Sequence, residues 1–169
     1  MILRGTIFNR KEKLMIQADY VIGIDPGKGG AGVLIDASGR YIEHFRGDDT
    51  QADQFAKLEG WQLAYEPCFC IVESVHSMPK QGISSSFKFG MGFGFLLGIV
   101  TACKIRYEKV SPQKWQGAMK CRSKGNKNIT KAKAQELFPQ VKVTHIIADA
   151  LLLAEYARRI AIERGYITK

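Results

Sequence analysis

Short apolar runs separated by glycine-containing turns occupy the first part of the chain. The runs Tyr20–Asp25, Ala31–Asp36 and Tyr41–Arg46 are joined by the segments PGKGG and ASGR. Runs of this length between such turns predict β-strands, and their close spacing favours an antiparallel meander. A fourth run, Cys68–Glu73, is apolar up to its last residue, which is typical of a strand that is buried on both faces.

Beyond these strands, apolar residues recur at helical spacing. One more strand, Ile105–Val110, interrupts the helical part of the chain. The predicted helices are Thr50–Ala64, Ser84–Cys103, a short helix with Ser111 as N-cap and Pro112 as its first residue, Thr130–Phe138 and His145–Arg164. An order of three strands, helix, strand, helix, strand and then helices predicts one α/β domain.

Glycine residues mark one face of the second predicted helix. Gly90, Gly94 and Gly98 fall at every fourth position, so they form one stripe on that helix. Each glycine lowers helix stability by up to about 1 kcal/mol relative to alanine. We therefore expect a closely packed neighbour against this stripe to offset that loss.

The length of 169 residues fits one domain. Residues 1–18 show no clear periodicity and are expected to form an N-terminal extension to a single domain over residues 19–169. An apolar fraction of 46% and a charged fraction of 24% argue against a disordered or fibrous chain. The 25 Lys and Arg residues against 16 Asp and Glu residues give a net charge of +9, which favours a polyanionic partner such as nucleic acid.

The four cysteines form no CxxC pair, so we expect free thiols rather than a zinc site. Free thiols indicate a reducing compartment, cytoplasmic or otherwise intracellular. A basic mitochondrial presequence at the N-terminus remains an alternative. The apolar stretch Phe93–Cys103 is short and rich in glycine, so we expect no membrane span.

Three acidic residues occupy positions where a carboxylate is costly. Asp25 and Glu73 each close an apolar strand, and Asp149 lies within the apolar helical segment IIADALLLAEY. Taken singly, the first is a turn former and the second a strand end, but buried carboxylates must be neutralised, paired or bound to a metal. Together the three predict a site for a hard cation such as Mg²⁺ or Mn²⁺. His145 projects from the same helix face as Asp149, where it can bind a second metal ion or move protons.

These motifs also carry a family resemblance. The pattern IGIDPGxxGxG, the segment IVE at the end of a buried strand and ADALLLAEYARR on the last helix resemble the RuvC-type Holliday-junction resolvases, above all their phage and poxviral members. Those proteins are ribonuclease H-like nucleases. The resemblance implies an α/β, ribonuclease H-like fold with a mixed five-stranded sheet flanked by helices, in which the first strand lies beside the fourth.

The resemblance also implies a metal site. It brings Asp25 and Glu73 together and places Asp149 over them as metal ligands. The family's fourth ligand is usually an Asp, or a His in some members, slightly upstream on the last helix, and His145 holds that position here. Two Mg²⁺ ions per active site are implied, with Mn²⁺ also supporting activity, and no small-molecule cofactor.

Basic residues are concentrated between Lys104 and Lys133, where Glu108 is the only acid. Any one of them fits an ordinary solvated surface, but as a block beside a metal site they predict a surface that binds phosphates. The resemblance places Lys114 and Lys131 near two basic residues beside the scissile phosphate, Lys131 being assigned to the catalytic site. The predicted DNA contacts are His76, Lys114, Lys120, Arg122, Lys124, Lys127 and Lys133.

Aromatic residues near the second helix have two interpretations. His76 follows Glu73 by three residues, where some relatives carry an aromatic residue that stacks at the opened junction. The phenylalanines of that helix are expected to make core and dimer contacts rather than to stack on bases. They are Phe87, Phe89, Phe93 and Phe95.

The combined expectation is a metal-dependent endonuclease that resolves four-way or otherwise branched DNA into symmetric nicks. Two symmetric cuts need two sites, so we expect a homodimer with the glycine-striped helix as a candidate interface. The alternatives are a ribonuclease H-like nuclease acting on RNA–DNA hybrids or flaps, and a branched-DNA-binding protein without catalysis. An actin-like or sugar-kinase fold is disfavoured because the chain is short and has no second phosphate loop.

Overall fold

The computed structural model describes residues 19–67, 69–75 and 82–167. Within them the strands form one sheet in the order β3-β2-β1-β4-β5. The strands are β1 (Tyr20–Asp25), β2 (Ala31–Asp36), β3 (Tyr41–Arg46), β4 (Phe69–Glu73) and β5 (Tyr107–Val110). β1, β2 and β3 pair antiparallel, whereas β4 pairs parallel to both β1 and β5. The predicted meander and the mixed five-stranded α/β sheet are confirmed.

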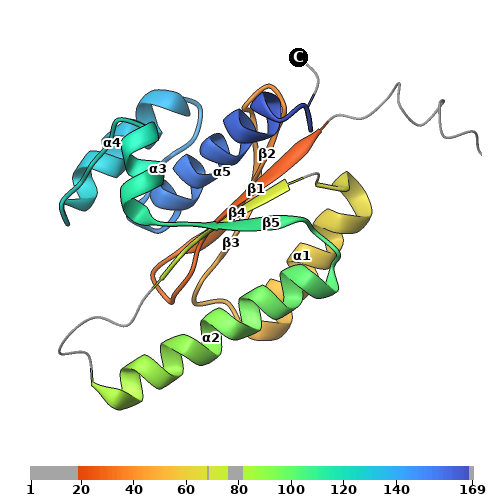
Figure 1. The fold of residues 1–169 in the computed structure, drawn as a ribbon, viewed down its shortest axis with the longest axis vertical. Helices are drawn as coiled ribbons and strands as arrows, with labels where there is room; N and C mark the ends of the chain where they lie inside the picture. The colour runs from red at the N-terminus through yellow and green to blue at the C-terminus, as the bar shows by residue number, and fades with distance from the viewer. Residues whose placement is uncertain (1–18, 68, 76–81, 168–169) are drawn as a thin grey trace, which may run out of the picture.

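Helices cover both faces of this sheet (Figure 1). They are α1 (Gln51–Tyr65), α2 (Ile83–Ala102), α3 (Pro112–Ala118), α4 (Lys127–Leu137) and α5 (His145–Glu163). α3, α4 and α5 lie on one face, and α1 and α2 lie on the other. The alternation of side chains along β1 divides the core accordingly. Val21 belongs to the cluster under α5, whereas Ile22 and Ile24 belong to the cluster under α1 and α2.

Helix α5 crosses β1 with its backbone against the strand because Gly23 has no side chain. A Cβ at Gly23 would lie 2.0 Å from the backbone nitrogen of Ala154 and 2.5 Å from the carbonyl oxygen of Ala150. Both distances are far below van der Waals contact, so glycine alone fits at this crossing. Gly23 and Asp25 share one face of the strand. The crossing therefore also sets how closely the Asp149 turn of α5 approaches Asp25.

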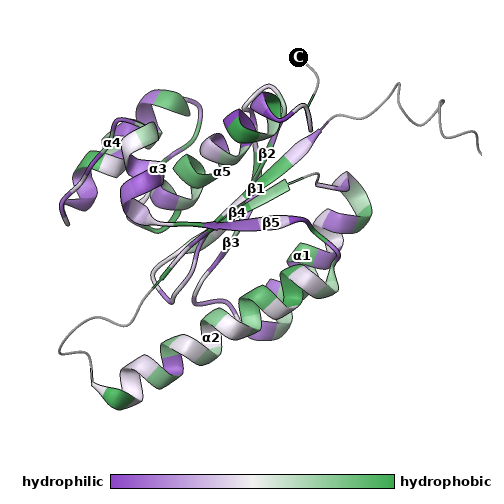
Figure 2. Ribbon diagram, viewed as in Figure 1, coloured by the Kyte–Doolittle hydropathy of each residue, from purple (hydrophilic) through white to green (hydrophobic). Residues whose placement is uncertain are grey.

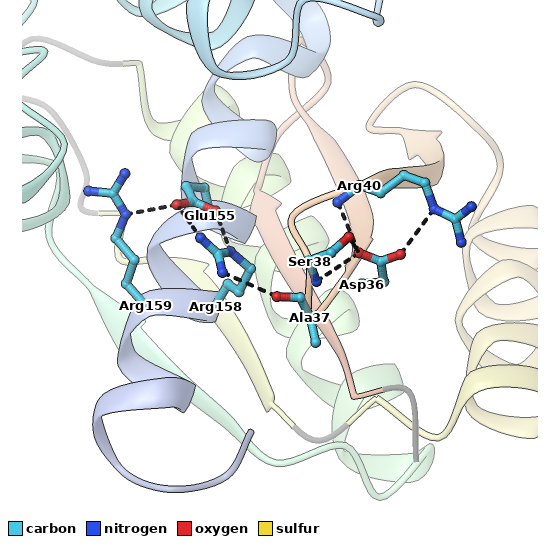
Figure 3. A network of polar contacts seen from close by, with 7 residues as sticks. All are labelled: Asp36, Ala37, Ser38, Arg40, Glu155, Arg158 and Arg159. Carbon is cyan, nitrogen blue, oxygen red and sulfur yellow. Dashed lines mark hydrogen bonds and ion pairs between the residues drawn. The ribbon is translucent and has the colours of Figure 1, made fainter. Parts of the chain in front are cut away.

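A network of ion pairs within α5 and one hydrogen bond connects the following turns of this helix to the neighbouring hairpin (Figure 3). Glu155 is 6% exposed and accepts hydrogen bonds from Arg158 Nε at 2.7 Å and Arg159 Nε at 2.8 Å. Arg158 also donates to the carbonyl oxygen of Ala37, in the turn between β2 and β3, at 3.1 Å. Burial opposes the ionisation of Glu155, but the two guanidinium groups outweigh it and lower the pKa of this carboxyl. The network fixes the position of α5 along the sheet.

Helix α4 starts earlier than the sequence predicted. It begins at Lys127 instead of Thr130, because Asn126 caps it by accepting a hydrogen bond from the Asn128 backbone N–H at 3.0 Å. The last residues of the predicted basic loop therefore lie in the first turn of a helix. Ser111 is the N-cap of α3 as expected, although its side chain makes no capping hydrogen bond.

Helix α2 contacts the sheet through its C-terminal half, where Leu96, Ile99 and Val100 are buried. Its N-terminal half extends past the sheet (Figure 1), and Figure 2 shows green and pale residues over most of its length. This helix of 20 residues is long and apolar enough to cross a membrane, judged by length and composition alone. The core helices of soluble proteins meet the same criterion, but they are mostly buried, whereas 17% of the apolar window is buried here. The apolar segment is thus longer than the predicted Phe93–Cys103, and the absence of a membrane span stays a prediction.

The outer face of α2 has no partner within the described residues. Ile83, Phe87 and Met91 are 92%, 67% and 57% exposed. A Cβ added at any glycine of the predicted stripe, namely Gly90, Gly94 or Gly98, would meet no atom within 4 Å. The close neighbour expected against this stripe is therefore not supplied by the described part of the chain.

We predict that Gly23→Ala lowers the free energy of unfolding by about 3 kcal/mol or more, because the added methyl group must displace α5 from β1. Gly60→Ala is the matched control. Gly60 lies in α1 with nothing within 4 Å of an added Cβ, so alanine there should raise stability by up to about 1 kcal/mol. Urea unfolding followed by circular dichroism measures both variants. A Gly23→Ala protein as stable as the wild type would contradict the close crossing.

Candidate active site

Three elements bring three carboxylates to one edge of the sheet. Asp25 is the last residue of β1 and Glu73 is the last residue of β4. The two strands are parallel neighbours in which Ile24 pairs with Val72, so both acids leave the sheet at the same end. Asp149 follows one turn after the start of α5, the helix that crosses β1 at Gly23. The grouping predicted for these three acids is the one that the fold produces.

The electrostatics of the three acids show that they act on one another. Burial, followed by the charges of Glu73 and Asp149, raises the pKa of Asp25 to about 8. Burial also raises the pKa of Glu73, and Asp149 adds to the shift. The ammonium group of Lys127 opposes both shifts. The site therefore concentrates more negative charge than its own cations compensate.

Hydrogen bonds leave part of this carboxylate group unsatisfied. Trp115 Nε1 donates to Glu73 Oε1 at 2.7 Å, and the indole is completely buried in the core between α3 and α5. This bond holds one oxygen of Glu73 in place. By contrast, Asp149 Oδ1 is buried and has no hydrogen-bond partner among the described residues. A buried acceptor without a partner is costly unless a ligand binds it.

These features fit a divalent cation. The available donors are carboxylate oxygens, which suit Mg²⁺ and Mn²⁺. A cation at this edge would bind the orphaned Asp149 oxygen and offset the mutual repulsion that raises the pKa of Asp25. Over the described ranges, no three His, Cys, Asp or Glu side chains are already arranged as a complete metal-binding group. The carboxylates are neighbours that a cation would have to draw together.

His145 lies further out than the three acids. It is the first residue of α5, one turn before Asp149, and its side chain is exposed. The charges that act on Asp25 come from Glu73, Asp149 and Lys127. The structure therefore places His145 on the same helix as Asp149 but does not bring it into the interacting group, and its role as a ligand stays a prediction.

The predicted basic residues differ in how close they lie to the carboxylates and in how exposed they are. Lys127, predicted only as a DNA contact, starts α4 close enough to influence two of the carboxylates, and Lys131 follows one turn later and is half-buried. Lys133 is paired with Glu136 at 2.6 Å. Four more predicted contacts, Lys114, Lys120, Arg122 and Lys124, are exposed. His76 lies outside the described residues.

Sequence reasoning missed two residues of this site. Trp115 was part of a short helix with no assigned role, and its only signal was an indole N–H that needs an acceptor when buried. Cys121 is a buried thiol whose pKa is raised to about 11, by burial first and then by the charge of Asp149. It contributes apolar packing beside the carboxylates, and its thiol stays protonated.

Comparison with known proteins shows which solved structures share this fold. No family model and no curated protein matches the chain. Among solved structures, Thermus thermophilus RuvC is 16% identical, with a TM-score of 0.64 over 86% of this chain and 96% of that one. The same protein in complex with a Holliday junction substrate gives a TM-score of 0.59 at 16% identity, over 87% and 96% of the two chains. The yeast mitochondrial Holliday junction resolvase Ydc2 gives 0.53 at 15% identity, over 94% and 89%. The predicted ribonuclease H-like fold is confirmed.

We predict that Asp25→Asn raises the thermal stability of the metal-free protein, and more so as the pH rises from about 5 to about 8. The folded state holds the proton of Asp25 up to about pH 8, whereas the unfolded state loses it near 3.8. Ionisation therefore destabilises the wild type as the pH rises through this window, and asparagine does not ionise. Thermal melts with a chelator at both pH values measure the difference. A gain that is independent of pH would contradict the raised pKa.

Proposed function

We propose that this protein is a structure-selective endonuclease that cuts four-way or otherwise branched DNA by metal-dependent hydrolysis. The observation that carries the proposal is the meeting of Asp25, Glu73 and Asp149 at one sheet edge, with mutually unfavourable charge and an orphaned carboxylate oxygen. The likeness to the resolvase folds and the net charge of +9 support it.

The proposed mechanism assigns each group a task. Asp25, Glu73 and Asp149 would hold two Mg²⁺ or Mn²⁺ ions, with His145 as the fourth ligand. When bound, such a pair would lower the pKa of the attacking water and stabilise the charge on the leaving 3′-oxygen. Asp25 must lose its proton before it binds a cation, since its pKa is raised to about 8.

Two other parts of the site would act on the substrate and on the ligand geometry. Lys127, whose charge acts on Asp25 and Glu73, and Lys131, one turn later on the same face of α4, would stabilise phosphate charge in the transition state. Trp115 would keep one oxygen of Glu73 in a fixed orientation. The exposed cations of α3 and of the following loop would bind the phosphates of the arms.

A homodimer belongs to the same proposal, because two symmetric nicks need two active sites. The candidate interface is the outer face of α2. Its exposed Ile83, Phe87 and Met91, together with the uncovered glycine stripe, would allow close helix packing.

The test of the proposal is a cleavage assay in Mg²⁺ on a four-way junction, a three-way junction, a flap, a duplex and an RNA–DNA hybrid. We expect cleavage of the junctions, and we expect Asp25→Asn, Glu73→Gln and Asp149→Asn each to reduce it at least about 100-fold. Junction binding should stay near the wild-type level, because phosphate contacts come from Lys and Arg.

Two further variants complete this assay. His145→Ala should lose most activity and His145→Asp should keep it, whereas Glu163→Gln at the exposed end of α5 should change nothing. Preferential cutting of the hybrid would replace the substrate assignment. Binding without any cleavage would favour the non-catalytic alternative, and full activity in any one of the three carboxylate variants would refute the assigned site.

The indole–carboxylate bond gives a second test with an internal control. Trp115→Phe removes the donor to Glu73. We therefore predict a loss of cleavage of about 10- to 100-fold, which is typical when a contact that orients a metal ligand is removed, and a higher half-saturating Mg²⁺ concentration. Trp61→Phe removes the equivalent bond to Glu43, at 2.6 Å and away from the site. Both variants should lose about 1–3 kcal/mol of stability, but Trp61→Phe should keep activity and Mg²⁺ dependence. Equal kinetic effects would show that Trp115 acts through stability alone.

A further inference from the structure

A cavity of about 560 Å³ opens beside Asp25 on the sheet face opposite α5. It lies between three segments, namely the β1–β2 turn, the loop from β3 to α1, and the N-terminal half of α2. Its volume falls within the range of about 300–1,000 Å³ that is usual for sites of small organic ligands. Asp25 lies at its edge, so the cavity adjoins the carboxylate group without being part of it.

One side of the cavity is a stripe of α2. The stripe residues follow helical spacing and are Ser85, Lys88, Phe89, Gly92, Phe93 and Leu96. This face differs from the one that carries the exposed Phe87 and Met91. Three of the four phenylalanines expected in the core or at a dimer contact, Phe89, Phe93 and Phe95, are half-buried and line the cavity, and Phe93 and Phe95 also pack against the core as expected.

Phe89 is held against the β1–β2 turn. Gly27 in that turn has a φ of +113°, and a Cβ there would lie 3.2 Å from Cε2 of the Phe89 ring. The absence of a side chain at Gly27 lets the ring approach the turn that follows Asp25. The remaining ring surface borders the cavity, where a planar group can stack on it.

The border of the cavity carries two lysines that can contact phosphates. Lys28 and Lys88 are exposed at its border. Two of the three acids of the lining are engaged by Arg46, whose guanidinium pairs with Asp48 at 2.8 Å and whose backbone N–H donates to Asp49 at 2.7 Å, and the third acid is Asp25. The lining therefore combines aromatic walls with two lysines that have no ion pair within the described chain. Channels that bind single-stranded nucleic acid combine the same features.

We propose that this cavity binds one unstacked nucleobase of a DNA strand, with Phe89 as the stacking surface and Lys28 and Lys88 as contacts to the neighbouring phosphates. The assignment rests on the proposed function, which it extends to a base-binding subsite beside the cleavage site. A second copy of the chain is the less favoured occupant, because the outer face of α2 offers the larger exposed residues.

The test measures binding without cleavage. The probes are a fluorescent thymidine hexanucleotide and a hexanucleotide of abasic residues with the same phosphates, both in a chelator. We expect the wild type to bind the thymidine probe about tenfold more tightly than the abasic probe, since one stacked base contributes this much. Phe89→Ala should remove most of that preference, and Lys88→Ala should weaken both probes equally.

Phe55→Ala is the matched control, because it removes an exposed phenylalanine ring of α1 that does not line the cavity, and it should keep the preference for bases. A pair of tryptophan variants gives a readout that does not depend on stability. Phe89→Trp fluorescence should be quenched by the thymidine probe and not by the abasic one, whereas Phe55→Trp fluorescence should respond to neither. Equal binding of both probes by the wild type, or an equal loss in the two alanine variants, would overturn the cavity assignment.

The assay separates this proposal from the proposed function. A protein that shows base-dependent quenching at Phe89→Trp but cuts no junction supports the cavity and contradicts the nuclease. A protein that cuts junctions but shows no base preference overturns the cavity alone.

Discussion

At Gly23, helix α5 reaches β1 with no side chain between the two backbones, because the glycine leaves room for the helix. Most helices pack on sheets through interdigitating side chains, which hold the two backbones apart. Here the contact joins the backbone of Ala150 and Ala154 to the centre of β1. The residue that precedes Ala150 is Asp149, and the one two positions after Gly23 is Asp25. The same contact that completes the core therefore brings an acid from the last helix to an acid from the first strand.

That approach has an electrostatic cost within the metal-free protein. Two carboxyl groups have raised pKa values, and an oxygen of the third is buried without a partner. Folding supplies the offsetting free energy elsewhere, in the apolar contacts of α5 and in the Glu155 network that anchors its next turns to the β2–β3 hairpin. Repulsion between carboxylates is typical of functional sites and not of hydrophobic cores, because apolar packing does not favour three acids at one sheet edge.

The sequence predicted the strands and the three acids because both depend on local signals. Apolar runs end at Asp25 and Glu73, and Asp149 interrupts an apolar helix, so each acid was visible from its neighbours. The pairing of β1 with β4 could be predicted only from the family resemblance, because strand order depends on contacts between segments that are distant in the sequence. The contact from Trp115 to Glu73 was not predictable, since 42 residues separate the partners and a single indole carries no periodicity. The start of α4 was misplaced because the Asn126 cap lies inside a run of lysines that reads as a solvated loop.

Two lysines of the basic segment adopt a backbone conformation that favours glycine. Lys120 and Lys124 adopt left-handed conformations with φ of 56° and 47°, a region in which a residue with a Cβ is less stable than glycine by about 1 kcal/mol. Gly125, at the next position, also has a positive φ, of 91°. Lysine at the other two positions keeps a cation on the surface at a local conformational cost. Both lie between α3, which supports Glu73 through Trp115, and α4, which places Lys127 beside the carboxylates. The exposed lysines and the carboxylate site are thus held by the same two short helices, so a polyanion bound along the lysines, as we propose, would be directed toward the acids.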